Sequence, residues 1–138
     1  MNIAVRYHSR TGNTKKVALA IAEEAGVTAQ DLSAPLDEKA DVLFLGSAIY
    51  AAGIDSAVKR FIQENKDKIG IIYNLSTTAL LKSTYKKVKK AATKSGVAIA
   101  GQEFYCRGRF KGAHKDRPND DDLKNAKIFA REALQNHE

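Results

Sequence analysis

The chain has 138 residues, a length that predicts a single domain spanning residues 1–138. Hydrophobic residues make up 43% of it and charged residues 28%, an ordinary globular composition that argues against a disordered protein. One cysteine excludes an internal disulfide bond, and with three histidines it also argues against a metal site. No apolar run approaches the ~20 residues of a membrane-spanning helix and no signal-peptide pattern opens the chain, so we expect a cytoplasmic protein without membrane insertion.

The net charge of +7 is unevenly distributed along the chain. The first half is electrically neutral, whereas the second half carries the whole basic excess, most of it between residues 82 and 117. Such a charge steers anionic ligands or acidic partner proteins toward a surface, although a solvated lysine-rich helix face gives the same pattern. Aromatic residues are not interleaved with the lysines and no nucleic-acid-binding motif is present, so we do not expect a nucleic acid as partner.

The hydrophobic pattern predicts strands and helices that alternate. In chain order, it predicts a strand at 3–7, a helix at 14–25, a strand at 27–32, a turn or a single helical turn at 35–40, a strand at 41–46, a helix at 55–65, a strand at 69–73, a helix at 79–96, a strand at 97–105 and a helix from residue 120 onward. This alternation indicates an α/β fold with parallel strands and with helices on both faces of the sheet.

Four predicted segments leave the carboxyl ends of strands, where sheets of this kind bind ligands: 8–14, 46–55, 74–79 and 106–119. The most informative is Ser9-Arg10-Thr11-Gly12-Asn13-Thr14. It offers three hydroxyls, an amide and the N–H groups of a helix N-terminus, a donor set that suits a phosphate. The same six residues are also compatible with a loop that simply ends in a Ser/Thr helix cap.

This segment, placed directly after the first strand, resembles the S/T-x-T-G-x-T phosphate loop of flavodoxins. The run from Asp41 to Tyr50 is similar to the third strand of that family and its first flavin-flanking loop. The resemblance implies a flavodoxin-like three-layer sandwich, with a five-stranded parallel sheet in the order 2-1-3-4-5. It also implies non-covalently bound FMN and an electron carrier that works with redox partner proteins.

The resemblance further implies which residues contact FMN. The phosphate would lie on the loop formed by Ser9, Arg10, Thr11, Gly12, Asn13 and Thr14. The ring would lie between two segments that supply Ser47, Ala48, Ile49 and Tyr50 on one side and Asn74, Leu75, Ser76 and Thr77 on the other. Tyr50 is the candidate for stacking on the ring, with a tyrosine that covers the edge of the sheet as the other interpretation. No residue is assigned a catalytic role.

Three features depart from the flavodoxin pattern: the chain has no tryptophan, residues 48–54 include no acidic residue, and the whole chain is basic. Typical flavodoxins are acidic and meet basic reductases, so the basic charge favours acidic redox partners here. Positive surroundings also favour a cofactor that gains negative charge on reduction. We therefore predict a less negative potential for the second electron than in acidic flavodoxins.

A second resemblance gives an alternative function. The segment from Gly46 to Ala57 also looks like the corresponding loop of menaquinone-dependent protoporphyrinogen oxidases, which are flavodoxin-like enzymes with FMN. The alternative is a small FMN-dependent oxidoreductase acting on a quinone-like or anionic, tetrapyrrole-type substrate. The cations that would attract such a substrate's carboxylates are Arg107, Arg109, Lys111, Lys115 and Arg117.

Two further side chains lie near these segments. Cys106 next to Arg107 is either a thiol made reactive by a neighbouring cation or a small buried hydrophobe at a strand end, and we favour the second interpretation. His8 is expected to be a loop residue or a neighbour of the phosphate.

Overall fold

The computed structural model describes residues 1–50, 53–79, 83–109 and 116–137. Its elements in chain order are β1 (Ile3–Tyr7), α1 (Asn13–Ala25), β2 (Ala29–Asp31), β3 (Ala40–Tyr50), β4 (Gly53–Ile54), α2 (Ser56–Glu64), a short 3-10 helix (Lys66–Lys68), β5 (Ile69–Thr78), α3 (Tyr85–Lys94), β6 (Ala98–Ile99), β7 (Phe104–Arg107) and α4 (Asp120–Gln135).

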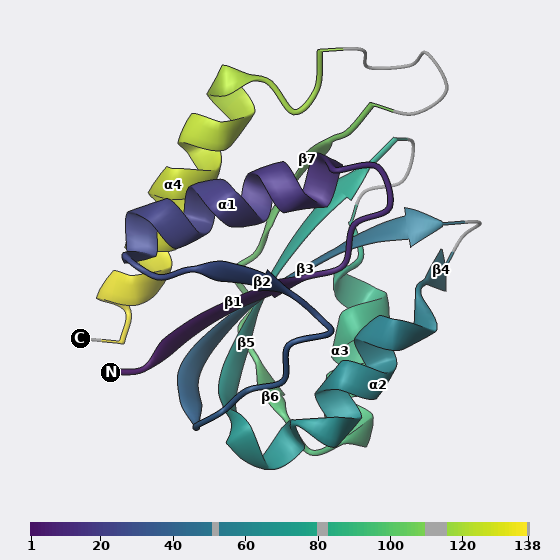
Figure 1. Cartoon of the computed structure of the whole chain (residues 1–138), viewed down its shortest axis with the longest axis vertical. Helices are drawn as coiled ribbons and strands as arrows, with labels where there is room; N and C mark the ends of the chain where they lie inside the picture. Colours follow the sequence, from purple (N-terminus) through teal and green to yellow (C-terminus); the bar gives the residue numbers. More distant parts are fainter. Residues whose placement is uncertain (51–52, 80–82, 110–115, 138) are drawn as a thin grey trace.

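The sheet has the order β2-β1-β3-β5-β6, with β7 also paired to β5 and β4 paired to β3. Every pair is parallel except β3–β4. Helices α1 and α4 lie together on one face, and α2 and α3 lie on the other (Figure 1). The predicted α/β three-layer architecture and its strand order are therefore confirmed, with β5 as the fourth strand and β6 and β7 together as the fifth.

The predicted fifth strand is divided because its middle leaves the ladder. Ile99 pairs with Ile72 and Phe104 pairs with Leu75, so the edge strand has more residues than β5 between the two pairs. The extra length falls on Gly101 and the polar residues after it. Such an excursion is tolerated at the edge of a sheet, where one side of the strand is unpaired.

Two predicted strand ends are wrong, because both strands run further than their apolar residues suggest. The segment after Gly46 was expected to be a loop, but β3 continues to Tyr50 and turns back into β4. The segment after Tyr73 was also expected to be a loop, but β5 continues to Thr78. The helix expected from Ala79 begins at Tyr85.

Two hydrophobic cores cover the two faces of the sheet. Alternate residues of β3 point to opposite sides, so Val42 and Phe44 pack toward α1 and α4, and Leu43 and Leu45 toward α2 and α3. All four side chains are fully buried. This explains why β3 reads as a continuous apolar run, as a strand covered on both faces should.

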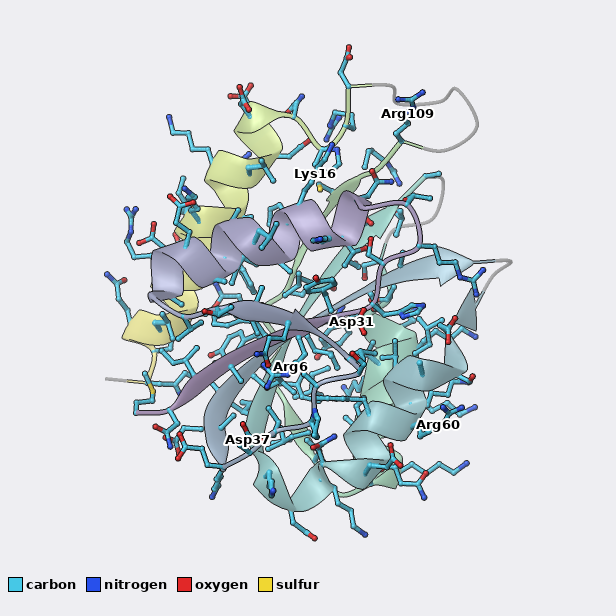
Figure 2. All side chains as sticks on the ribbon, viewed as in Figure 1. Arg6, Lys16, Asp31, Asp37, Arg60 and Arg109 are labelled. Carbon is cyan, nitrogen blue, oxygen red and sulfur yellow. The ribbon has the colours of Figure 1, made fainter. Side chains whose placement is uncertain are left out.

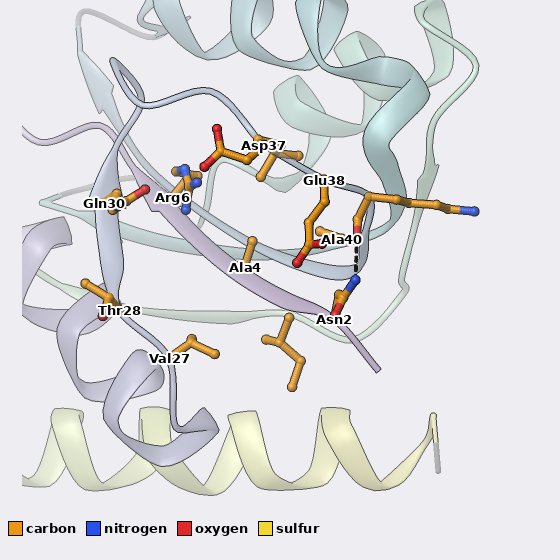
Figure 3. Close-up of a pocket in the computed structure, with 12 residues that line it drawn as sticks. Asn2, Ala4, Arg6, Val27, Thr28, Gln30, Asp37, Glu38 and Ala40 are labelled. Atoms are coloured by element: carbon orange, nitrogen blue, oxygen red, sulfur yellow. Dashed lines mark hydrogen bonds between the residues drawn. The ribbon is translucent and has the colours of Figure 1, made fainter.

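Among the described residues, no helix covers β1 and β2 on the α2 side, since residues 32–39 connect β2 to β3 without forming one. Arg6 fills part of this space, and its side chain donates hydrogen bonds to the carbonyls of Val5, Ala34 and Pro35. A groove of about 390 Å³ remains, with Arg6 and Asp37 among its lining residues (Figure 3). It lies at the amino ends of β1 and β3, away from the edge where ligands of this fold class bind.

None of the helices within the described ranges is long and apolar enough to cross a bilayer.

Candidate functional site

The loop from His8 to Gly12 joins the carboxyl end of β1 to the start of α1. The His8 N–H donates to the Gly46 carbonyl at 3.0 Å, which holds the loop beside β3. Gly12 precedes the helix with φ +90°, in the left-handed region that favours glycine. Its N–H donates to the Ser9 hydroxyl at 3.0 Å. The loop is therefore closed by its own hydrogen bond and by its contact with β3.

Helix α1 has no side-chain cap among the described residues. Its first-turn N–H groups and the positive end of its dipole consequently face the loop, an arrangement that suits an anion. The predicted phosphate loop thus has the local form of an anion site. The Lys16 N–H donates to the Gly12 carbonyl at 3.1 Å, which starts the helical hydrogen-bond pattern.

The first turn of α1 is fixed against the sheet by Thr14. The side chain of Thr14 is buried, and its hydroxyl lies 2.8 Å from that of Thr77 on β5. A Cβ at Gly46 would lie 2.9 Å from the Thr14 methyl and equally close to Leu75, so glycine permits the helix to approach this closely. The loop 9–14 therefore lies over the ends of β1 and β3, the position at which the strand order reverses.

A second group of polar side chains lies under the start of α3. We call it the Thr84 cluster, and it consists of Ser47, Asn74, Ser76 and Thr84. The Thr84 hydroxyl accepts hydrogen bonds from Ser47 Oγ at 2.9 Å and from Asn74 Nδ2 at 3.1 Å. The Thr84 N–H donates to Ser76 Oγ at 3.3 Å. All four residues are fully buried, so the cluster joins α3 to β3 and β5.

The predicted ring-flanking residues of β5 are therefore inside the sheet rather than on a loop. Asn74 and Ser76 bond to Thr84, Thr77 bonds to Thr14, and Leu75 packs in the core beneath α1. The helix predicted at 79–96 contains Thr84, which was given no role in the site. Nothing in the local sequence around Thr84 indicates its hydrogen-bond partners on β3 and β5.

Of the predicted residues on β3, Ser47 is buried in the Thr84 cluster, and Ala48 and Ile49 are half-buried at the end of the strand. Ile49 pairs with Ile54 and the Tyr50 backbone pairs with Gly53, which closes a hairpin. The Tyr50 side chain, with its predicted stacking role, lies outside the described residues, as do Ala51 and Ala52.

Asp55 connects the loop after β1 to the hairpin after β3. Its carboxylate accepts from Arg10 Nη2 at 2.9 Å and lies 3.2 Å from His8 Nε2. It also caps α2, accepting from the Ala57 N–H at 2.9 Å. The Ala57 N–H and the Arg10 guanidinium lower the pKa of Asp55 to about 2. Sequence reasoning treated Asp55 only as the start of a helix, since nothing local indicates partners in the loop 8–10.

The end of β7 forms the third side of the site. Asn13 Nδ2 donates to the Arg109 carbonyl at 2.9 Å, and the Gly108 N–H donates to the Thr78 carbonyl at 3.1 Å. A Cβ at Gly108 would lie 2.8 Å from Asn13 Nδ2, so a glycine allows this approach. Arg109 lies at the end of the molecule where α1 begins (Figure 2).

The basic segment 106–119 is only partly described, because Lys111 and Lys115 lie outside the described residues. Arg107 donates to the Thr78 hydroxyl at 3.0 Å. Arg117 pairs with Asp122 at the start of α4, with Nη2 to Oδ1 at 2.7 Å, and this hydrogen bond raises the pKa of Arg117.

Cys106 is buried at 7% exposure between β5 and α4. Burial, with a smaller contribution from Asp122, raises the pKa of its thiol to about 12. A thiol with this pKa is protonated at neutral pH and is not a nucleophile. The structure thus supports the interpretation of Cys106 as a buried hydrophobe.

Comparisons with known proteins agree with this geometry. A family model described as a flavodoxin domain matches residues 4–113. An uncharacterized protein of Methanocaldococcus jannaschii, MJ0298, is 32% identical over 138 residues, covering 90% of the chain and 91% of that protein.

Solved flavodoxin structures have a similar fold. A flavodoxin from the domain Archaea superimposes with a TM-score of 0.78 and 17% identity, over 99% of the chain and 98% of that structure. Oxidised flavodoxin 1 from Bacillus cereus gives a TM-score of 0.74 and 16% identity, over 98% of both. The resemblance drawn from the loop 9–14 is confirmed, and the chain belongs to the flavodoxin family.

Proposed function

We propose that the protein binds FMN at the carboxyl edge of its sheet and carries electrons between redox partner proteins. The observation that carries the proposal is the start of α1, which follows a left-handed Gly12 and has no side-chain cap among the described residues. This arrangement offers several N–H donors and a positive dipole end to one anion.

The donor chemistry of the loop fits the phosphate of a mononucleotide. Ser9 and Thr11 contribute hydroxyls to the loop, and the Asn13 side chain donates a hydrogen bond to the Arg109 carbonyl. In this proposal the phosphate is held by residues 9–14. The ring lies between the segments that supply Ser47–Tyr50 and Asn74–Thr77, and the Thr84 cluster joins these two strands.

FMN, when bound, supplies the electron-transfer chemistry, and the residues of the chain bind and orient it. Asp55 has a pKa of about 2, so its carboxyl group is ionised at neutral pH and does not donate a proton. Arg10 Nη2 donates to this carboxylate at 2.9 Å, and His8 Nε2 lies 3.2 Å from it. This arrangement favours an electron carrier over an enzyme that protonates a substrate.

The alternative, a small FMN-dependent oxidoreductase for a quinone-like or tetrapyrrole substrate, depends on the cations of segment 106–119. Arg117 is paired with Asp122 and Arg107 donates to Thr78, so both have structural partners. We therefore retain the carrier as the proposal. Rapid turnover of a quinone or a tetrapyrrole without any partner protein would support the alternative instead.

The test compares FMN with riboflavin, which lacks the phosphate. We expect the flavin-free protein to bind FMN at least about 100-fold more tightly than riboflavin, because the loop 9–14 contacts only the phosphate. Thr11→Val should weaken FMN binding about tenfold, since one hydrogen bond to a charged group is lost, and it should leave the affinity for riboflavin unchanged. Thr28→Val, in the groove of Figure 3, is the control. Equal affinities for the two flavins, or no binding of either, would refute the proposal.

A further inference from the structure

Helix α3 presents a row of cations to solvent. Its inward side consists of Val88 and Ala92, both fully buried. Its sequence, Tyr85–Lys94, contains no acidic residue. We call its exposed side the lysine face, and it consists of Lys86, Lys87, Lys89, Lys90 and Lys94.

On the opposite side of the molecule, two cations are paired with carboxylates. There, Lys127 of α4 pairs with Glu23 of α1 at 3.1 Å, and Arg131 pairs with Glu24 at 3.4 Å. Within the described ranges, no ion pair includes a residue of the lysine face. The lysines repeat at spacings of three and four residues, so like charges meet along the helix and destabilise it. A partner that supplies carboxylates would relieve this repulsion.

An exposed aromatic side chain lies on the face of the sheet that α3 covers. Tyr105 of β7 is 44% exposed and pairs in register with Ser76. Register partners in a parallel sheet point to the same face, so Tyr105 points to the side on which Ser76 Oγ accepts from the Thr84 N–H. Exposed tyrosine is enriched at protein-binding surfaces, where the aromatic ring supplies contact area, and charges elsewhere on such a surface set the orientation of the partner.

Further contacts place Lys89 near the edge of the sheet to which Tyr105 belongs. The Tyr85 hydroxyl donates to the Ala100 carbonyl, at the edge of the sheet that β7 also occupies, at 3.0 Å. Lys89 Nζ lies 6.0 Å from the centre of the Tyr85 ring. The lysine face therefore begins at this edge and continues along α3.

The lysine face also begins at the candidate site. Thr84, the residue before α3, bonds to Ser47 and Asn74 near the carboxyl ends of β3 and β5. A protein docked on α3 would lie next to the edge at which the ring of FMN is proposed. Short separation between the two redox centres is what an electron carrier needs.

We propose that the lysine face and Tyr105 form the docking surface for an acidic redox protein, one whose own redox centre is surrounded by Asp and Glu side chains. The redox role of the partner rests on the proposed function, whereas the binding itself does not. A protein partner is favoured over a nucleic acid because one exposed tyrosine does not make a stacking platform.

The test uses two triple variants with the same change in net charge. The first is Lys86→Glu, Lys89→Glu and Lys90→Glu on the lysine face. The matched control is Lys39→Glu, Lys66→Glu and Lys124→Glu, three exposed lysines in the connection before β3, in the short 3-10 helix and in α4. A plant-type [2Fe–2S] ferredoxin serves as the acidic one-electron probe. Its binding to the flavin-free protein is measured by NMR chemical-shift titration at several salt concentrations, and FMN affinity is measured separately.

We expect wild-type protein to bind the ferredoxin at low ionic strength and to lose affinity as salt is added. The face variant should bind about tenfold or more weakly, and the control about twofold or less. Tyr105→Ala should weaken binding without changing its salt dependence. All variants should retain their FMN affinity.

Equal losses in the two triple variants would overturn the proposal, since net charge alone would then explain binding. Absence of salt-dependent binding by the wild type, or stronger binding of a single-stranded oligonucleotide at the lysine face, would also overturn it. Failure to bind FMN would refute the proposed function and leave the ferredoxin titration interpretable, because that titration needs no flavin.

Discussion

Asp55 is the residue that links two segments of the candidate site. One carboxylate both caps α2 and pairs with Arg10 of the loop after β1. Because the folded-state pKa of about 2 is below the ~3.9 of an unfolded aspartate, folding binds fewer protons at this position. The resulting contribution to the free energy of unfolding is present above about pH 4 and is lost as the pH falls toward 2.

Asp55→Asn removes the negative charge but keeps the helix cap, since asparagine caps helices as well as aspartate does. We expect it to lower the free energy of unfolding by ~0.5–1 kcal/mol at pH 7, the usual range for a partly exposed ion pair. The difference from wild type should shrink at pH 3. Urea unfolding followed by circular dichroism at both pH values measures it. Asp55→Ala should cost a further ~1 kcal/mol at pH 7 by removing the cap. A deficit of the Asn variant that is unchanged at pH 3 would contradict this account.

Thr84 carries the second residue-scale prediction. Thr84→Val keeps the shape of the side chain but leaves Ser47 and Asn74 without their buried partner. We expect a loss of ~2–3 kcal/mol in the free energy of unfolding, because buried polar groups without hydrogen bonds are costly. Thr84→Ser retains the hydroxyl and should recover most of that loss. Chemical denaturation measures the free energy of unfolding of the two variants. Equal losses of this free energy would show that the hydroxyl is not the important group.

At the scale of elements, the pairing of β3 with β5 depends on a close approach at Gly70. A Cβ there would lie 2.4 Å from the Asp41 carbonyl oxygen, a backbone atom that cannot rotate away. Gly70→Ala should therefore push the two strands apart and lower the free energy of unfolding by ~2–4 kcal/mol. Gly101→Ala is the matched control, because a Cβ at Gly101 meets nothing within 4 Å. Thermal unfolding of both proteins gives the comparison, and similar midpoints for the two would show that the strands adjust.

The same strands show how much of the fold the sequence predicts. Their apolar halves were predicted because burial on both faces leaves a continuous hydrophobic run. Their polar ends were assigned to loops because polar residues such as Ser47 and Thr77, judged from the neighbouring sequence alone, are expected to be exposed to solvent. Their hydrogen-bond partners lie 37 and 63 residues away, so only the folded chain shows that these side chains are satisfied inside the sheet.

Part of the candidate site could also be predicted from the sequence, and part could not. The loop 9–14 was recognised because its glycine and hydroxyls are consecutive in sequence, and the structure places it at the reversal of strand order. The contribution of Asp55 was missed because Arg10 lies 45 residues away. The predicted roles in flavin binding of Ser47, Asn74, Leu75, Ser76 and Thr77 stay predictions. In the proposed flavin site, their burial gives several of them a supporting role beneath the residues that would contact the ring.

At the scale of the whole molecule, the net charge of +7 bears on the redox potential of bound FMN. A second electron adds negative charge to the cofactor, and surrounding cations stabilise that charge while carboxylates oppose it. Typical flavodoxins are acidic, whereas here the described part of the hairpin, up to Asp55, has no acidic residue, and Asp55 is paired with Arg10. We therefore predict a less negative potential for the second electron than acidic flavodoxins show.

Salt provides the internal control for this prediction, because screening weakens the influence of exposed charges beyond about 10 Å at 0.1 M ionic strength. Potentiometric titration of the FMN-loaded protein should give a second-electron potential that becomes more negative as salt is added. The lysine-face triple variant should shift it in the same direction at low salt, and more than the matched control does, because α3 begins at the Thr84 cluster and none of the control lysines lies on α3. A potential as negative as that of acidic flavodoxins, or one that does not respond to salt, would show that hydrogen bonds near the ring dominate over the charge of the molecule.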